Sequence, residues 1–265
     1  MKYNYLGKSD LNVSEIGFGC MSLPANENEA VNIIHEAIEK GINYFDTADV
    51  YDKGNNEIIV GKALSAKRNK IVLASKVGNV AKNDGSPGFN WNPSKKHILE
   101  SIHDTLKRLN TDYIDLYQLH GGTMEDNIEE TIEAFELLKQ QGKIKYYGIS
   151  SIRPPVIEEY VKRSNIVSVM TQYSLLDRRP ETFLPLLHQN KISVVVRGAL
   201  AQGLLAGKPA KEYLHLSKEE VEKIAASINH SSHAAINYVL QQPAVASAVI
   251  GIRTKEQLND VISGL

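Results

Sequence analysis

The chain has 265 residues, of which 42% are hydrophobic and 23% are charged, enough apolar material for one large core. Its 30 basic residues balance 31 acidic ones, and the net charge of −1 indicates neither a nucleic acid nor an anionic membrane surface as partner. The single cysteine, Cys20, excludes an internal disulfide framework and a clustered-thiolate metal site.

Targeting segments and linkers are the next features that the sequence can reveal. The N-terminal MKYNYLGKSD lacks the apolar core of a signal peptide, and no apolar run approaches the roughly 20 residues that span a bilayer. We therefore expect a cytoplasmic protein without a membrane partner. No linker-like segment divides the chain, so we expect one domain over residues 1–265. No exposed heptad pattern stands out, and a monomer is the default expectation.

Short β-type runs alternate with stretches of helical periodicity along the chain. A hairpin is expected first, over residues 2–13, with its turn at 7–10. The predicted strands are residues 16–20, 42–46, 70–75, 113–119, 144–148, 167–172, 192–196 and 245–250. The predicted helices are residues 29–40, 56–64, 93–108, 128–140, 155–162 and 180–188, with two further short helices between 212 and 242.

Eight strands with intervening helices favour an α/β fold of the (β/α)8 barrel type over an open doubly wound sheet. Several strands, such as ISVVV at 192–196, are apolar on both faces, as strands covered by helices are. The N-terminal hairpin precedes the first barrel strand. We expect it to plug the bottom of the barrel.

Four polar residues lie at or just beyond the ends of buried apolar runs. They are Asp46 after residues 42–45, Lys76 after 71–74, His120 after 113–119, and Tyr51 five residues past Asp46. Because parallel strands of a barrel end at one face, these side chains are expected to form one site. Asp46 and Lys76 would also suit a merely structural buried ion pair.

The chemistry of these four groups points to the polarisation of a carbonyl. A lysine ammonium stabilises a phenolate, so Lys76 would make Tyr51 a proton donor, and Asp46 would hold the ammonium charged and aimed. His120 can orient a carbonyl by hydrogen bonding. With neither a metal nor a nucleophile in this set, the missing reactant is a hydride, which a nicotinamide can supply.

Motifs along nearly the whole chain resemble those of the aldo-keto reductases. They are GFGCM at 17–21, YFDTADVY at 44–51, ASK at 74–76, YQLH at 117–120, GIS at 148–150, TQYSLLDR at 171–178, QGLLAGK at 202–208 and IGIRT at 250–254. The resemblance implies a (β/α)8 barrel that reduces aldehydes and ketones with NADPH. It also implies Tyr51 as general acid, Asp46 and Lys76 as the pair that tunes it, and His120 as the group that orients the substrate.

The same resemblance implies a set of cofactor-binding residues. These are Gly19, Cys20, Met21, Asp46, Ser150, Ser151, Gln172, Arg197, Gly198, Leu200, Gln202, Gly203, Lys208, Gly251, Arg253 and Gln257. Two of them depart from the family pattern: Ser151 replaces an asparagine, and Arg197 stands where many members stack an aromatic ring on the nicotinamide. Arg197 would favour the reduced cofactor by its charge or would instead contact a phosphate. Arg253, at the start of the last helix, favours NADPH over NADH.

The substrate and the alternative functions remain open in the sequence. Trp91 would join Tyr51 and His120 in the substrate pocket, or it serves packing alone, and small aldehydes, dicarbonyls or xenobiotic ketones are the expected substrates. One alternative is a sensor or accessory subunit that binds NADPH with little turnover. Another alternative is a metal-dependent hydrolase or a phosphate-sugar isomerase. These enzymes need a metal-ligand cluster or a catalytic glutamate at a strand end, and we find neither feature in the sequence. His230 and His233 lack a third ligand nearby.

Overall fold

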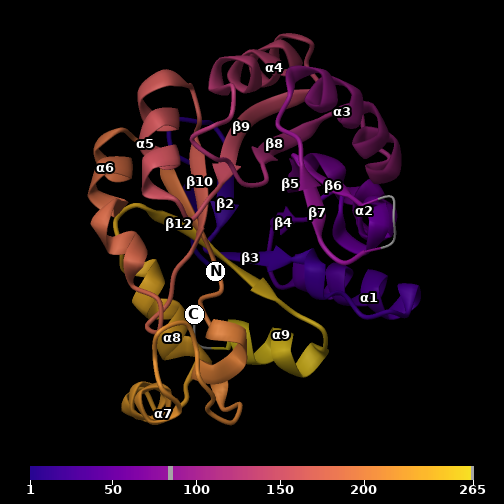
Figure 1. The fold of residues 1–265 in the computed structure, drawn as a ribbon. Coiled ribbons are helices and arrows are strands. Elements are labelled where there is room, and N and C mark those ends of the chain that lie inside the picture. The colour runs from indigo at the N-terminus through magenta and orange to yellow at the C-terminus, as the bar shows by residue number, and fades with distance from the viewer. Residues whose placement is uncertain (83–85, 264–265) are drawn as a thin grey trace.

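Eight parallel strands close into a barrel in the computed structural model, which describes residues 1–82 and 86–263. The strand order around the barrel is β10-β11-β12-β3-β4-β5-β8-β9. Figure 1 shows the helices arranged around these strands, from α1 in indigo to α9 in yellow. The predicted (β/α)8 fold is confirmed.

Each predicted barrel strand is present, and most bounds agree within two residues. The strands are β3 (Ile16–Gly19), β4 (Tyr44–Asp46), β5 (Val72–Val77), β8 (Ile114–Leu119), β9 (Ile144–Ser150), β10 (Ser168–Gln172), β11 (Ser193–Arg197) and β12 (Val245–Gly251). The helices are α1 (Glu27–Glu39), α2 (Asn55–Leu64), α3 (Lys95–Leu109), α4 (Ile128–Gln140), α5 (Pro154–Arg163), α6 (Leu184–Gln189), α7 (Lys218–Ser227), α8 (Ser232–Leu240) and α9 (Lys255–Ile262).

Local sequence explains where several helices begin and which face they bury. A polar residue caps the first turn in α1, α3, α4, α7, α8 and α9, where an Asn, Ser or Thr side chain accepts a backbone N–H. In α3 the buried residues Ile98, Ile102, Thr105 and Leu109 recur every three or four positions. This spacing gives one apolar stripe, which packs against the barrel.

Most residues of the barrel strands are buried, and alternate residues point to different cores. Val72, Ala74 and Leu116 belong to the cluster inside the barrel, whereas Leu73 and Tyr117 pack under the helices. Each such large side chain contributes roughly 1.5–3 kcal/mol by its burial. This alternation determines which strand-end residues enter the mouth.

The N-terminal hairpin β1 (Tyr3–Tyr5) and β2 (Asn12–Ser14) closes the barrel at the amino ends of the strands, as predicted. Leu6, Leu11 and Val13 belong to the same buried cluster as the inward residues of the barrel. Gly7, at φ +60°, donates its N–H to Ser193 Oγ at 2.7 Å, and a Cβ there would stand 2.2 Å from the carbonyl oxygen of Val167. Only glycine fits this turn.

Two segments differ from the sequence expectation. The helix predicted at 180–188 is broken into a 3-10 turn (Arg179–Thr182) and α6, because Pro185 lacks the N–H that a continuous helix needs but fits the first turn of a new one. The loop after β5 contains a hairpin that the sequence did not suggest, formed by β6 (Asn79–Ala81) and β7 (Phe89–Trp91).

Candidate active site

The mouth of the barrel collects the polar side chains that end β4, β5 and β8. Asp46 pairs in register with Ala74, and Lys76 pairs with Gln118, so neighbouring strands stop at nearly the same level. Asp46, Lys76 and Gln118 have the parity of the inward apolar residues that precede them in each strand. Three adjacent strands therefore bring their polar ends together above the apolar interior.

The Lys76 ammonium lies at the centre of this group. Its Nζ donates to Asp46 Oδ1 at 2.5 Å, to the Thr47 carbonyl oxygen at 2.7 Å and to the Tyr51 hydroxyl oxygen at 3.3 Å. These partners use all three ammonium protons. The Tyr51 oxygen is thus an acceptor, and its own proton is free to point elsewhere.

Burial and charge act in opposite directions on the Asp46–Lys76 pair. Burial alone would lower the pKa of Lys76, but the adjacent Asp46 carboxylate and the contact with Tyr51 outweigh it, so this pKa is raised. Burial raises the pKa of Asp46, against the opposing influence of Lys76 and of the Gln118 amide, which donates to Asp46 Oδ2 at 3.1 Å. We take Lys76 to be charged, because the acceptors around it stabilise the ammonium.

Tyr51 and His120 face one another across the mouth. Their rings make an edge contact with centroids 6.0 Å apart, and Lys76 Nζ lies 4.9 Å from the centroid of the Tyr51 ring. The His120 backbone is held by the carbonyl of Val77, which accepts its N–H at 2.7 Å, and by the Asn79 amide, which donates to the His120 carbonyl at 3.1 Å.

His120 presents a neutral imidazole. Burial, with the positive charges of Lys76 and Arg197, lowers the pKa of His120 to about 3. Its Nδ1 atom is buried without a hydrogen-bond partner among the described residues. A neutral ring with an unpaired nitrogen can donate to, or accept from, a bound group that carries the complementary atom.

Gln118 is a part of this site to which the sequence interpretation assigned no role. It is a fully buried polar residue within an apolar strand, with the inward parity of its neighbour His120. A polar residue at an inward position of a buried strand is the feature by which the sequence could have revealed Gln118 as part of the site. The hydrogen bond that the Gln118 side-chain amide donates to Asp46 fixes the orientation of the carboxylate.

The ends of β10 and β11 carry a second group of polar side chains. Gln172 donates from Nε2 to Asp177 Oδ2 at 2.9 Å and to the Tyr213 hydroxyl at 3.3 Å, while its Oε1 accepts from Arg197 Nη1 at 3.0 Å. Arg197 is exposed, yet its charge acts on both Asp46 and His120. A planar cation therefore lies beside the four predicted residues.

Comparison with known proteins identifies this arrangement. The model of the aldo/keto reductase family matches residues 15–265. The chain belongs to the aldo-keto reductase family. Members of this family are oxidoreductases that use a nicotinamide cofactor and act on small carbonyl compounds, so the family and the reaction class expected from the motifs are confirmed.

Three proteins illustrate the similarity. The chain is 55% identical to the uncharacterized oxidoreductase YqkF of Bacillus subtilis (strain 168), over 99% of this chain and 90% of that protein. The structure of aldo-keto reductase AKR11C1 from Bacillus halodurans, in its holo form, superposes with a TM-score of 0.95 at 52% identity, covering 100% of this chain and 90% of that chain. A protein named NADH-specific methylglyoxal reductase, from Escherichia coli (strain K12), is 35% identical over 81% of this chain and 72% of its own length.

The other residues that the aldo-keto reductase motifs single out lie along the same rim. Ser150 ends β9 and is half-buried, whereas Ser151 is buried and its Oγ accepts the Arg153 N–H at 3.2 Å. Gly198 and Leu200 begin the loop after β11, and Gln202 and Gly203 lie in its 3-10 turn (Ala201–Ala206).

The loop after β11 is closed by its own side chains. Lys208 crosses Gly203 so closely that a Cβ on this glycine would lie 2.8 Å from the lysine Cδ, and Lys208 Nζ donates to the Gln202 carbonyl at 2.9 Å. Gly203, one of the residues that the family resemblance assigns to cofactor binding, leaves room for the Lys208 side chain in this structure.

The segments after β3 and β12 complete the rim. Cys20 is buried, its Sγ contacts the Phe18 carbonyl and its own carbonyl accepts from Asn56 Nδ2 at 2.8 Å, whereas Met21 is exposed. Burial raises the pKa of the Cys20 thiol. Of these two residues, Met21 is therefore the one whose side chain is placed to contact a ligand.

The start of α9 already has partners within the chain. Thr254 Oγ1 accepts the Gln257 N–H at 3.3 Å, and Gln257 Oε1 accepts the Arg253 N–H at 2.8 Å. Gly251 ends β12 close to the Ser22 side chain, and the Arg253 residue is exposed. A phosphate bound here would have to displace or add to these contacts.

Trp91 packs beside the His120 end of the site. Its indole ring lies against the backbone of Gly78 and Gly121, where a Cβ would come within 2.8 Å and 3.0 Å of ring carbons, and its Nε1 donates to Asp126 Oδ1 at 2.8 Å. The ring therefore serves packing, and its half-buried position is also compatible with a pocket wall.

The two histidines that resembled a metal pair lie elsewhere and have other contacts. His233 Nε2 contacts the Asp260 carbonyl, and His230 Nε2 lies 3.4 Å from Glu222 Oε1. Residues 1–82 and 86–263 contain no group of three or more potential metal ligands. Within these ranges no helix combines the length and apolarity that a bilayer crossing requires.

Proposed function

We propose that this aldo-keto reductase reduces small aldehydes and dicarbonyl compounds with NADPH, and that Tyr51 protonates the carbonyl oxygen. The observation that carries the proposal is the bonding of Lys76. Its ammonium donates to the Tyr51 oxygen as well as to Asp46 and Thr47. A phenol whose oxygen accepts from a cation gives up its proton more readily.

The residues present fit a nicotinamide dinucleotide. Arg197 offers an exposed planar cation beside the site, and Gln172 offers an amide next to it. Arg253 stands at the exposed start of α9, where helix N–H groups and a guanidinium suit a phosphate. Such a cofactor supplies the hydride that the side chains lack.

Each member of the tetrad then has a definite task. Tyr51 moves a proton from its hydroxyl to the carbonyl oxygen of the substrate, and Lys76 stabilises the phenolate that remains. Asp46, oriented by Gln118, keeps Lys76 charged and in place. His120, neutral and with an unpaired Nδ1, positions the carbonyl by hydrogen bonding.

Arg253 and one relative bear on the choice of cofactor and of substrate. Arg253 favours the phosphate of NADPH, whereas one relative carries the name NADH-specific methylglyoxal reductase. That name supports dicarbonyls among the substrates of this chain. The ratio of kcat/KM for NADPH and NADH, measured with methylglyoxal, tests both points, and a preference for NADH would overturn the proposed role of Arg253. The cytoplasmic location and the monomeric state stay predictions.

The decisive experiment follows NADPH absorbance at neutral pH with a panel of aldehydes and dicarbonyls. We expect turnover that Tyr51→Phe abolishes while NADPH binding, followed by cofactor fluorescence, persists. Tyr5→Phe, on an exposed tyrosine of the hairpin at the other end of the barrel, is the matched control and should retain full activity.

Other outcomes separate the alternatives. If NADPH binds but neither the unmodified protein nor the control reduces any carbonyl, the protein is a cofactor-binding sensor or accessory subunit. If NADPH does not bind, the cofactor residues are wrongly assigned.

A further inference from the structure

The turn that presents Tyr51 has an unfavourable backbone. Tyr51 begins the 3-10 segment η2 (Tyr51–Gly54), in which Asp52, Lys53 and Gly54 have φ values of 46°, 54° and 90°. The left-handed conformation is unfavourable for a residue that has a Cβ. Contacts outside the turn must therefore hold it in this shape.

Arg108, on α3, is the side chain beneath this turn. A Cβ on Gly54 would lie 3.0 Å from Arg108 Cδ and 3.1 Å from its Nε, so the turn rests directly on the arginine stem. The guanidinium donates from Nε to Glu57 Oε2 at 2.7 Å and from Nη2 to Thr105 Oγ1 at 3.2 Å. Arg108 thus joins the turn, the first part of α2 and its own helix.

Glu57 extends this connection to the strand that carries Lys76. Its side chain is fully buried, and Oε1 accepts from Ser75 Oγ at 2.5 Å. Ser75 directly precedes Lys76 in β5. The line Arg108–Glu57–Ser75 therefore connects the Tyr51 turn with the strand that carries Lys76.

A second carboxyl group depends on the same arginine. Asp49, two residues before Tyr51, has a buried Oδ1 without a hydrogen-bond partner among the described residues. Burial and the nearby Glu57 raise the pKa of Asp49 to about 7, while Arg108 opposes them. The Asp49 N–H lies 3.4 Å from the Lys76 carbonyl oxygen that accepts it. Two acidic groups behind the site thus share one cation.

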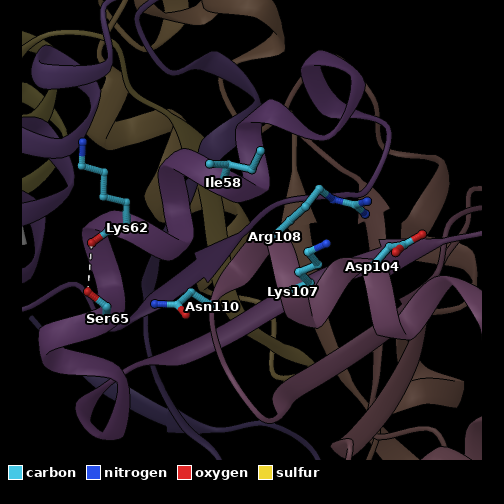
Figure 2. A pocket seen from close by; sticks show the side chains of 7 residues that line it. All are labelled: Ile58, Lys62, Ser65, Asp104, Lys107, Arg108 and Asn110. Carbon is cyan, nitrogen blue, oxygen red and sulfur yellow. Dashed lines mark hydrogen bonds between the residues drawn. The ribbon is translucent and has the colours of Figure 1, made fainter.

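The guanidinium reaches this network from the outer surface of the barrel. A groove of about 650 Å³ lies between α2 and α3. Figure 2 shows Arg108, Lys107 and Asp104 among the side chains that line it. The Arg108 side chain is 26% exposed, whereas Glu57 is completely covered. Arg108 lies outside the mouth, and it acts through Glu57 and the turn.

We propose that Arg108 is a positioning residue, which through Glu57 and Ser75 holds the strained turn so that the Tyr51 hydroxyl reaches Lys76. This inference rests on the proposed function of Tyr51. The Tyr51–Lys76 contact of 3.3 Å is already long for a hydrogen bond, so a small displacement of the turn breaks it.

The test compares variants at Arg108 in the full-length protein with NADPH and methylglyoxal, or another carbonyl of the panel that is turned over. We expect Arg108→Met to lower kcat by about 10- to 100-fold, because misplacement of a reacting group by about 1 Å has effects of this size. The Kd for NADPH and the KM for the carbonyl should change less than about twofold, since Arg108 touches neither ligand site. Arg108→Lys should recover part of kcat, because it keeps the stem under Gly54 and a cation near Glu57.

Two further variants separate positioning from stability. Lys107→Met removes a cation from the same groove without touching Glu57, and it should leave kcat unchanged. In the double variant Glu57→Gln/Arg108→Met no charge is left unpaired at Glu57, so its thermal midpoint should return toward that of the unmodified protein while kcat stays low. This variant also decides the matter if Arg108→Met does not fold.

The outcomes distinguish this inference from the proposed function. Unchanged kcat in Arg108→Met, or a double variant in which kcat recovers together with stability, would overturn the positioning role. A Tyr51→Phe variant that remains active would instead overturn the proposed function, whatever the Arg108 variants do.

Discussion

The two halves of the barrel mouth differ in how their polar side chains are bonded. At the ends of β4, β5 and β8, Asp46 and Lys76 are buried and bonded to each other, to Thr47 and to Gln118. The other half comprises the ends of β10 and β11 and the loop that follows. There, Arg197 is exposed and donates to the Gln172 side chain, and Lys208 donates to the Gln202 carbonyl.

This difference predicts different consequences for the two halves. The buried half is preorganised, because its charged groups are buried and are hydrogen-bonded to neighbouring groups of the protein. In the exposed half, Gln172 must exchange or share its bonds to Asp177 and Tyr213 when another group binds. Changes in the first half should therefore affect the rate and stability, and changes in the second should affect cofactor affinity.

The largest effect is expected for Lys76→Met. It should lower kcat by about 10³-fold, within the range for groups that support proton transfer. It also leaves the Asp46 carboxylate buried without its cation, which should lower the free energy of unfolding by about 3–5 kcal/mol. Urea denaturation and turnover measure the two effects.

The control for this prediction is Lys62→Met. Lys62 pairs with Glu27 at the surface, where both side chains are at least half exposed, and this change should cost no more than about 1 kcal/mol. Equal losses of stability in the two variants would contradict the preorganised character of the buried half.

The second effect concerns His120. In His120→Asn we expect kcat to fall by about 10²-fold, because an oriented hydrogen bond to the carbonyl is lost. The pKa of His120 is about 3 in the folded chain, against an ordinary value of 6.5, so the unfolded chain takes up this proton first as the pH falls.

The stability that the depressed pKa of His120 implies is fully present above pH 6.5 and is lost as the pH falls toward 3. Across that window the slope of unfolding free energy against pH should be less steep in His120→Asn, by up to about 1.4 kcal/mol per pH unit. Denaturation between pH 4 and pH 6 measures this, and equal slopes would show that His120 is not held neutral.

A smaller effect is expected for Arg197→Gln in the exposed half. With Arg197 beside the nicotinamide, as its proposed role requires, removal of its charge should strengthen NADP⁺ binding relative to NADPH by about 3- to 10-fold, because only the oxidised ring is positive. Fluorescence titration with both cofactors measures the ratio. Arg253→Gln is the matched control and should weaken both forms equally. An unchanged ratio in Arg197→Gln would place Arg197 against a phosphate instead.

The smallest effect is expected for Trp91→Phe. The phenyl ring can still pack over Gly78 and Gly121, but the hydrogen bond to Asp126 is lost, which should cost about 1 kcal/mol of stability. The KM for aromatic carbonyls, compared with that for methylglyoxal, shows whether the ring is also a pocket wall. A selective rise for aromatic substrates would support the wall, and equal values would leave packing as its role.

The parts of the fold that sequence could predict are those governed by local periodicity. Short β-type runs, several of them apolar on both faces, predicted all eight barrel strands. The β6–β7 hairpin was not predicted, because its short strands bury little and carry no strong alternation. The break before α6 was missed because the helical pattern continues across Pro185.

The candidate site shows the same limit. Asp46, Lys76 and His120 could be placed in one mouth because each follows a buried run, and parallel strands of a barrel end together. Gln118 lies inside such a run, where only its inward parity distinguishes it. Its partner Asp46 lies 72 positions away in the sequence.

The barrel and the kinds of chemical group at its mouth follow from the order of the amino acids alone, since apolar periodicity and strand ends are local properties. The atoms that those groups contact depend on how the elements pack in three dimensions. Arg108 meets Glu57 across 51 positions of sequence, and Arg197 meets Gln172 across 25. Such contacts form when barrel closure and helix packing bring distant segments together, and no local pattern encodes their distances.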